Sequence, residues 1–291
     1  MIRVAPFAPL RASQRDAGYV VGFGWVFFLA AFVRVTYIMA SRFPLHDGGL
    51  FFQMIQDLQA AHYRLPLVTS YNQAGIPFAY PPLAFYVAGW LSDLMHWPLI
   101  GVLWLLPPFL SLLCLGAFVL LAQRLLPDRG LVILASLAFA LAPRAYDWLI
   151  MGGGLTRAFG QLFALLFLHR LHRVYTVRRR ADVVLAAAFG AATVLSHLEW
   201  TYFAAYSALV FLAILGRDRW SMAASAVIAA GSALISAPWW VTVLSRDGLA
   251  PFIAAVTGSS HDWPLYSGVV AFLTLRWTEE PLFPLLTALA I

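Results

Sequence analysis

The sequence predicts an all-α protein that crosses a membrane many times. Of its 291 residues, 62% are hydrophobic and only 11% are charged, and the mean hydropathy is +0.80. A soluble domain carries about 25% charged residues. The apolar residues also gather in long runs, and only helices or closed barrels can cross a bilayer. Because the alternating pattern of a barrel is absent, we expect a helical bundle.

We expect about eight transmembrane helices in a single domain over residues 1–291. The expected crossings are residues 19–40, 99–123, 130–145, 155–171, 183–195, 201–216 and 220–244, with a further apolar region over 265–291. No segment is typical of a soluble domain, a linker or an internal repeat. The printed chain stops inside an apolar run, so we expect the natural reading frame to continue beyond it.

The positions of the arginines predict how the chain is oriented in the membrane and whether residues 81–96 cross it. This apolar segment is shorter than the roughly 20 residues that a crossing needs. If it crossed, the Arg-rich stretch 170–180 would face outward, although Lys and Arg favour cytoplasmic loops. If it lies at the surface, this stretch falls inside together with the N-terminal arginines. We therefore expect a cytoplasmic N-terminus and an integral, multi-pass position in the plasma (inner) membrane.

The same assignment makes residues 42–97 one external region with two interfacial helices. The first helix is FFQMIQDL, in which apolar residues recur at helical spacing, and the second follows Pro81 and Pro82. Positive-inside arginines also account for the net charge of +6, so we expect membrane lipid and no nucleic acid as a partner.

The head of this external region carries the first candidate acid. Asp47 follows the first span by a few residues and stands between His46 and two glycines. A carboxylate there could accept a proton from an attacking hydroxyl. It could also hold a divalent metal, Mg or Mn, that bridges phosphate oxygens. The alternative is that Asp47 only caps the helix that follows.

A second external loop carries an acid, a glycine run and an arginine. Asp147 could share a site with the first acid, or it could be a solvated loop side chain. Gly153 and Gly154 open a helix whose first turn holds Arg157. Free N–H groups at a helix start suit a phosphate, and an arginine there opposes the helix dipole unless an anion is present. The alternative is a tight helix entry with the arginine extending outward.

Two further polar features fall near the expected outer face. His197 and Glu199 lie where two short spans meet and could bind metal or transfer a proton, or form only a polar turn. Arg34 lies in the outer half of the first span and either snorkels to the interface or contacts an anion. Because three expected spans are short, their outer ends should line a recessed cavity.

The order of these features resembles the GT-C superfamily of integral membrane glycosyltransferases. The similar groups are the protein mannosyltransferases, the bacterial aminoarabinose transferases and the oligosaccharyltransferases. The resemblance covers about residues 19–215 and rests on the uncleaved first span, Asp47, the two external helices FFQMIQDL and PPLAFYVAGWL, the turn AQRLLPDRG and Asp147. The chain departs from the pattern in having one acid in the second loop, and Tyr80 where aminoarabinose transferases carry Lys or Arg.

The resemblance implies a GT-C-like bundle that transfers a hexosyl or pentosyl group at the external, periplasmic face. The donor would be a polyprenyl-phosphate-linked sugar, and the acceptor a lipid, glycan or protein. Asp47 and Asp147 would be catalytic, and with His197 and Glu199 they could hold the divalent metal. The remaining expected substrate-binding residues are His46, Tyr80, Gly153, Gly154 and Arg157. The alternative functions are a transporter or flippase and a non-catalytic membrane scaffold.

Overall fold

The computed structural model describes residues 12–40 and 48–257, and within them it confirms the all-α fold class. The longer helices are α1 (Ala12–Ala40), α2 (Gly49–Ala60), α3 (Leu83–Met95), α4 (Leu99–Leu125), α5 (Arg129–Leu141), α7 (Leu155–Val177), α8 (Arg180–Val194), α9 (Leu198–Leu215), α10 (Arg219–Asp247) and α11 (Ala250–Thr257). Short turns of helix are η1 (Tyr71–Gln73), η2 (Pro143–Ala145), α6 (Asp147–Ile150) and η3 (Gly152–Gly154). The β structure in these residues is one isolated bridge, Val68 to Pro77.

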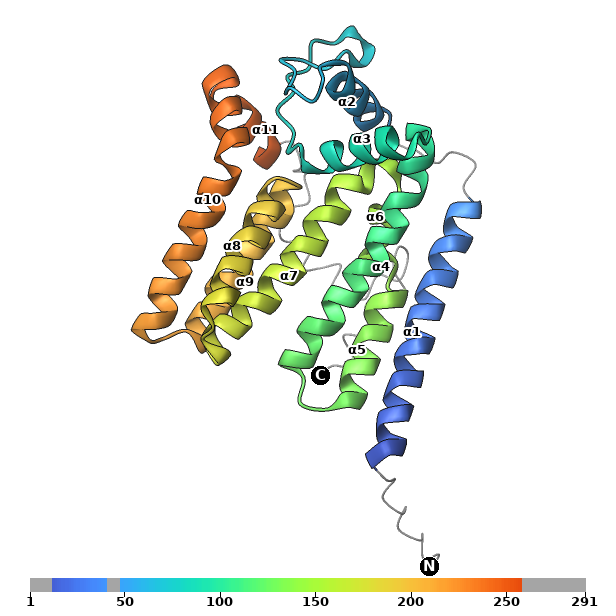
Figure 1. The fold of residues 1–291 in the computed structure, drawn as a ribbon, viewed down its shortest axis with the longest axis vertical. Coiled ribbons are helices and arrows are strands. Elements are labelled where there is room, and N and C mark those ends of the chain that lie inside the picture. The colour runs from blue at the N-terminus through green and yellow to red at the C-terminus, as the bar shows by residue number, and fades with distance from the viewer. Residues whose placement is uncertain (1–11, 41–47, 258–291) are drawn as a thin grey trace, which may run out of the picture.

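The long helices run side by side, and α2 and α3 lie across one end of the bundle (Figure 1). We call this the capped end. The turns α4–α5, α7–α8 and α9–α10 lie at the opposite end, where α1 also begins. The crosswise position of α3 agrees with the expectation that residues 81–96 do not cross the bundle.

Four described helices are long and apolar enough to span a membrane. They are α1 from Ala17, α4, α9 and α10. The helices α5 and α8 have 13 and 15 residues, and the apolar region 265–291 lies outside the described residues. The chain is therefore an all-α protein with several membrane helices, and a total of eight remains a prediction.

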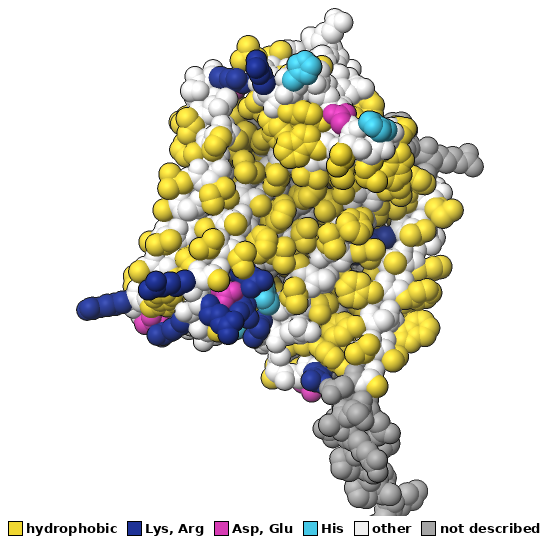
Figure 2. All heavy atoms as spheres, viewed as in Figure 1, with side chains coloured by type: hydrophobic (Ala, Val, Ile, Leu, Met, Phe, Trp, Pro, Cys, Tyr) yellow, Lys and Arg dark blue, Asp and Glu magenta, His cyan; other side chains and the backbone are white. Residues whose placement is uncertain are grey.

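Arginines gather at the end opposite α2 and α3, and apolar side chains cover the face between the two ends (Figure 2). We call the arginine-rich end the basic end and define it by Arg170, Arg173, Arg178, Asp182 and Asp218. Asp182 accepts hydrogen bonds from Arg173 Nε at 2.9 Å and Arg170 Nη1 at 3.0 Å. Arg178 Nη2 lies 2.9 Å from Asp218 Oδ2. The grouping agrees with the arginine count, and its assignment to the cytoplasmic side remains a prediction.

Arg34 fixes α1 to its neighbours and does not snorkel. It is 1% exposed, and its Nε donates to Ser111 Oγ at 2.8 Å. Its Nη1 donates to the carbonyls of Ala30 and Ala140 at 3.1 and 3.0 Å, and its guanidinium lies 4.7 Å from the Tyr146 ring centroid. The snorkelling alternative is therefore wrong, because neutral acceptors inside the bundle hold the charge. An anion contact stays a prediction, since the buried Nη2 has no partner among the residues that the structure describes.

The helices α2 and α3 and the loop between them pack as a small folded unit, which we call the α2–α3 unit. The buried faces of α2 and α3 meet at Ile55, Leu58 and Phe85. The loop between them is pinned by Asp57, which accepts hydrogen bonds from Thr69 Oγ1 at 2.7 Å and from the Ser70 backbone at 2.8 Å. Partial burial would raise the pKa of Asp57, but the hydrogen bonds from Ser70 and Thr69 outweigh it and lower that pKa.

Two long-range contacts attach the α2–α3 unit to the rest of the bundle. The Leu83 N–H at the start of α3 donates to the Leu195 carbonyl, in the turn between α8 and α9, at 2.9 Å. Arg246 Nη1, near the end of α10, lies 3.3 Å from the carbonyls of both Leu65 and Pro66. The unit is therefore held over the ends of α8, α9 and α10.

Candidate functional site

Side chains from four segments meet at the capped end, beneath the start of α3. Arg157 Nη2, in the first turn of α7, lies 3.7 Å from Glu199 Oε2, in the first turn of α9. The Arg157 guanidinium is 5.3 Å from the Trp148 ring centroid. The Tyr80 and His197 rings meet edge to face at 6.3 Å. We call these five residues the Arg157 cluster. Four of them were predicted site residues, and Trp148 was not.

Gly154 allows η3 to pack against α6, which brings Trp148 toward Arg157. A Cβ atom on Gly154 would lie 2.0 Å from the Trp148 carbonyl oxygen and 2.9 Å from the backbone of Leu149. Only glycine leaves room for this approach. Gly153, in the same turn, is half-buried. The structure thus gives Gly154 a packing role, and substrate contact by either glycine remains a prediction.

Gly160 brings α7 and α9 together at the cluster, and the sequence reasoning missed it. A Cβ atom here would lie 2.7 Å from His197 Cβ and 3.0 Å from Trp200 Cδ1. Its absence lets the start of α9 lie against α7, with His197 buried between them. The available signal was an isolated glycine within a helical pattern, which often marks a close packing contact.

His197 is neutral at pH 7 in this setting. It is 7% exposed, and burial, followed by the positive charge of Arg157, lowers its pKa to about 4. Its Nδ1 is buried and has no partner among the described residues. A neutral imidazole can accept a proton or bind a metal, but it is not protonated at neutral pH and so does not act there as a general acid. Proton transfer, one of the predicted roles, would therefore start from the neutral form of His197 and remains a prediction.

Arg157 keeps donors available for an anion. Its contact with Glu199, at 3.7 Å, is longer than a hydrogen bond, and the Glu199 side chain is 53% exposed. The Arg157 Nε is buried without a partner among the described residues. The guanidinium also stands at the N-terminus of α7, where the helix dipole disfavours a cation. An anion held by the partly exposed guanidinium of Arg157 would offset the unfavourable interaction with the dipole.

The structure places Asp147 beside the cluster along the chain. It is the first residue of α6, is half-buried, and accepts a hydrogen bond from the Trp148 N–H at 2.6 Å. Its charge also raises the pKa of the adjacent Tyr146, where burial has the larger effect. Trp148 therefore links Asp147 to Arg157.

His46 and Asp47 lie outside the described residues. The N-cap position of α2 belongs to Gly48, which has no side chain to cap with. The Phe51 ring, in the first turn of α2, lies 5.0 Å from the ring of Tyr80. The segment that follows Asp47 thus contacts the Arg157 cluster through Tyr80, and the role of Asp47 itself remains a prediction.

The predicted metal site is not assembled by the described residues alone. Within residues 12–40 and 48–257, no three His, Cys, Asp or Glu side chains lie close enough together to hold a metal ion. Glu199 faces Arg157, a cation. A divalent site that includes Asp47 remains a prediction.

The comparisons with known proteins give no match for this chain, neither among protein-family models nor among curated proteins. The GT-C resemblance therefore rests on the order of features in the sequence.

Proposed function

We propose that the chain is a membrane glycosyltransferase that uses a polyprenyl-phosphate-linked sugar. It transfers the sugar to a lipid, glycan or protein acceptor at the external, periplasmic face. The observation that carries the proposal is Arg157: among the described residues it is a partly exposed cation at the capped end, loosely paired at 3.7 Å with an exposed carboxylate. A lipid phosphate fits such a site, because charge-assisted hydrogen bonds between arginine and phosphate are strong and directional.

In the proposed reaction an acceptor hydroxyl attacks the anomeric carbon of the donor. The new bond is between that carbon and the acceptor oxygen, and the bond between that carbon and the phosphate oxygen breaks. The polyprenyl phosphate leaves with the bonding electron pair, and Arg157 stabilises its negative charge. The acceptor proton passes to a carboxylate, the role predicted for Asp47.

The aromatic side chains around Arg157 support a sugar between the phosphate and the acceptor. Trp148 is 54% exposed and carries the Arg157 guanidinium over its ring, while Tyr80 lies against His197. Rings of this kind combine a large apolar face with a polar edge. The recessed, neutral His197 leaves Arg157 as the cation of the cluster.

The test is transfer from a radiolabelled polyprenyl-phosphate sugar in membranes that contain the full-length protein. Arg157→Gln should weaken donor use by about 10- to 100-fold, the size expected when a hydrogen bond to a charged group is lost. Asp47→Ala should abolish transfer while donor binding persists. Arg178→Gln is the matched control, because Arg178 pairs with Asp218 at the basic end.

Unchanged transfer by Arg157→Gln would remove the observation on which the proposal rests. Cysteine labelling at position 147 separates the alternatives, since the native Cys114 is buried. Labelling from the external side alone supports an enzyme with one active face. Labelling from both sides supports a transporter and contradicts the proposal.

A further inference from the structure

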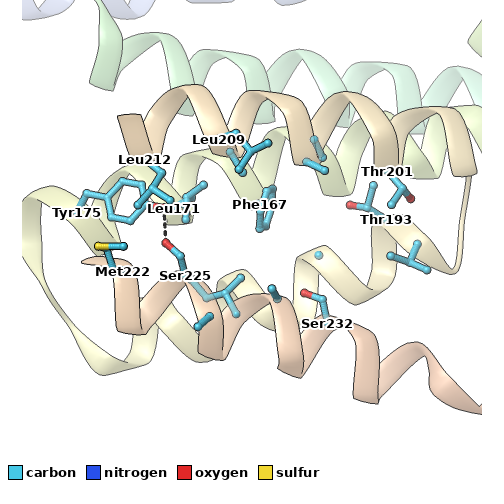
Figure 3. A pocket seen from close by; sticks show the side chains of 18 residues that line it. Phe167, Leu171, Tyr175, Thr193, Thr201, Leu209, Leu212, Met222, Ser225 and Ser232 are labelled. Carbon is cyan, nitrogen blue, oxygen red and sulfur yellow. Dashed lines mark hydrogen bonds between the residues drawn. The ribbon is translucent and has the colours of Figure 1, made fainter. Parts of the chain in front are cut away.

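A cavity of about 510 Å³ lies within the bundle between α7, α8, α9 and α10 (Figure 3). We call it the slot. Its 18 lining residues include small ones such as Gly190, Ala204, Ala208 and Ala229, which leave the space open. A cavity of this size matches those that bind small molecules.

The walls of the slot offer nothing to a polar ligand. None of the lining residues is charged, and each of the five hydroxyl groups already has a partner. Thr193 and Thr201 donate to carbonyls one turn earlier, at 2.8 and 3.0 Å. Ser232 donates to a carbonyl of α8 at 3.1 Å, and Tyr175 and Ser225 bond to each other at 2.7 Å. Because these groups are satisfied, the ligand that fits the slot is a hydrocarbon.

The slot opens sideways between α9 and α10. On the other side α8 and α10 are in close contact, since a Cβ atom on Gly190 would lie 2.3 Å from Ser232 Oγ. Leu209 of α9 and Met222 of α10 both line the slot and are 66% and 60% exposed. Both helices are long and apolar enough to span a membrane. A lipid chain can therefore enter from the bilayer without crossing a polar surface.

One end of the slot reaches the turn that carries the Arg157 cluster. The lining residues of α9 run from Thr201 to Leu212, a length of about 16 Å in a helix. Thr201 Oγ1 bonds to the carbonyl of His197, and Glu199 lies between them in the chain. A chain lying in the slot would thus run toward the capped end, where the Arg157 cluster lies.

We infer that the slot holds the hydrocarbon chain of a single-chain lipid phosphate whose phosphate binds Arg157. The inference rests on the proposed function and locates the lipid part of its donor. The slot has room for one hydrocarbon chain, and Arg157 can bind one phosphate, as a single-chain lipid phosphate requires. Lipid tails are as apolar as the helices, so the favourable contribution comes from filling a void that would otherwise lack packing contacts.

The test uses a sugar-free polyprenyl monophosphate with a photoreactive diazirine in its chain. After irradiation of the full-length protein in membranes, labelled peptides should map to α9 and α10. Ala229→Trp fills the slot and should lower this labelling at least tenfold. Ala230→Trp is the matched control, because Ala230 is also exposed on α10 but does not line the slot. Arg157→Gln should also weaken labelling in the slot, whereas Ala230→Trp should leave it at the wild-type level.

The outcomes separate this inference from the proposed function. Labelling in the slot without any sugar transfer supports the slot as a lipid-phosphate site and contradicts the enzyme. Sugar transfer with labelling elsewhere, or equal labelling in Ala229→Trp and Ala230→Trp, overturns the inference and leaves the enzyme standing. Equal labelling by a photoreactive diacyl phosphatidic acid also overturns it, because the slot would then not select a single chain.

Discussion

The two ends of the bundle hold their charges in different ways. At the basic end Asp182 is 2% exposed and receives two arginines at 2.9 and 3.0 Å. At the capped end Arg157 faces Glu199 at 3.7 Å, with both side chains partly exposed. Buried polar atoms that have no partner among the described residues occur at both ends, for example Nε of Arg170 and of Arg157. The difference therefore lies in the geometry of the ion pairs.

This difference distinguishes charged groups that stabilise the fold, at the basic end, from a charged group that can bind a ligand, at the capped end. A buried carboxylate that receives two guanidinium groups at hydrogen-bonding distance depends on both of them to offset its desolvation. A loosely paired arginine contributes little to stability and can exchange its partner for another anion.

The largest effect is expected at Gly154, on which the packing of the capped end depends. Gly154→Ala places a methyl group against the Trp148 carbonyl and should destabilise the protein by at least about 3 kcal/mol, the upper range for overpacking. Thermal unfolding in detergent measures the effect. Gly24→Ala is the control, because nothing lies within 4 Å of its added Cβ. Equal melting temperatures for the two variants would contradict the close approach of η3 to α6.

The next effect is a pH dependence that comes from His197. The unfolded histidine binds a proton near pH 6.5 and the folded one at about pH 4, so the unfolded state holds more protons between these values. Stability should therefore fall by up to about 3 kcal/mol as the pH drops from 7 to 4. Comparison of wild type with His197→Gln isolates this contribution. A variant that retains the full acid sensitivity would show that His197 is not its source.

Loss of one arginine at the basic end should cost less. Arg173→Gln leaves the buried Asp182 with Arg170 as its remaining cation, and we expect a loss of about 2 kcal/mol, below the cost of a fully unpaired buried charge. The measurement is again thermal unfolding. The double variant Arg173→Gln/Asp182→Asn should recover part of the loss, and no recovery would show that the charge pair is not responsible.

The smallest effect is expected at the capped end, where Glu199 is exposed. Glu199→Gln removes the carboxylate facing Arg157 and should change stability by less than about 0.5 kcal/mol. Inorganic phosphate should then protect this variant against unfolding at least as well as it protects wild type, since Arg157 has lost its competitor. A loss comparable to that of Arg173→Gln would remove the distinction between the ends.

Much of the fold followed from the sequence because apolar period and charge placement are local signals. The expected crossing 99–123 lies within α4, and the expected surface segment 81–96 contains α3, which lies across the bundle. Helix ends were less accurate. The segment 155–171 extends to Val177 as α7, because basic residues continue the helix beyond its apolar part.

The candidate site was only partly predictable. Tyr80, Arg157, His197 and Glu199 were expected and do meet. Gly160, Trp148 and the slot were not expected, because they depend on how closely α7, α8, α9 and α10 approach one another. Such distances are set by small residues facing across different helices, and periodicity within one helix does not show which glycines and alanines will face each other.

The contact of Arg246 with the loop carbonyls of Leu65 and Pro66 sets an order of assembly. The partners are 181 and 180 residues apart in the chain. At synthesis rates of about 5–20 residues per second, the loop emerges roughly 10–40 s before α10 is made. The hydrogen bond from Leu83 N–H to the Leu195 carbonyl likewise forms only after the turn between α8 and α9 has been synthesised. The α2–α3 unit therefore reaches its final position late, and the capped end closes only after the helices that form the slot are in the membrane.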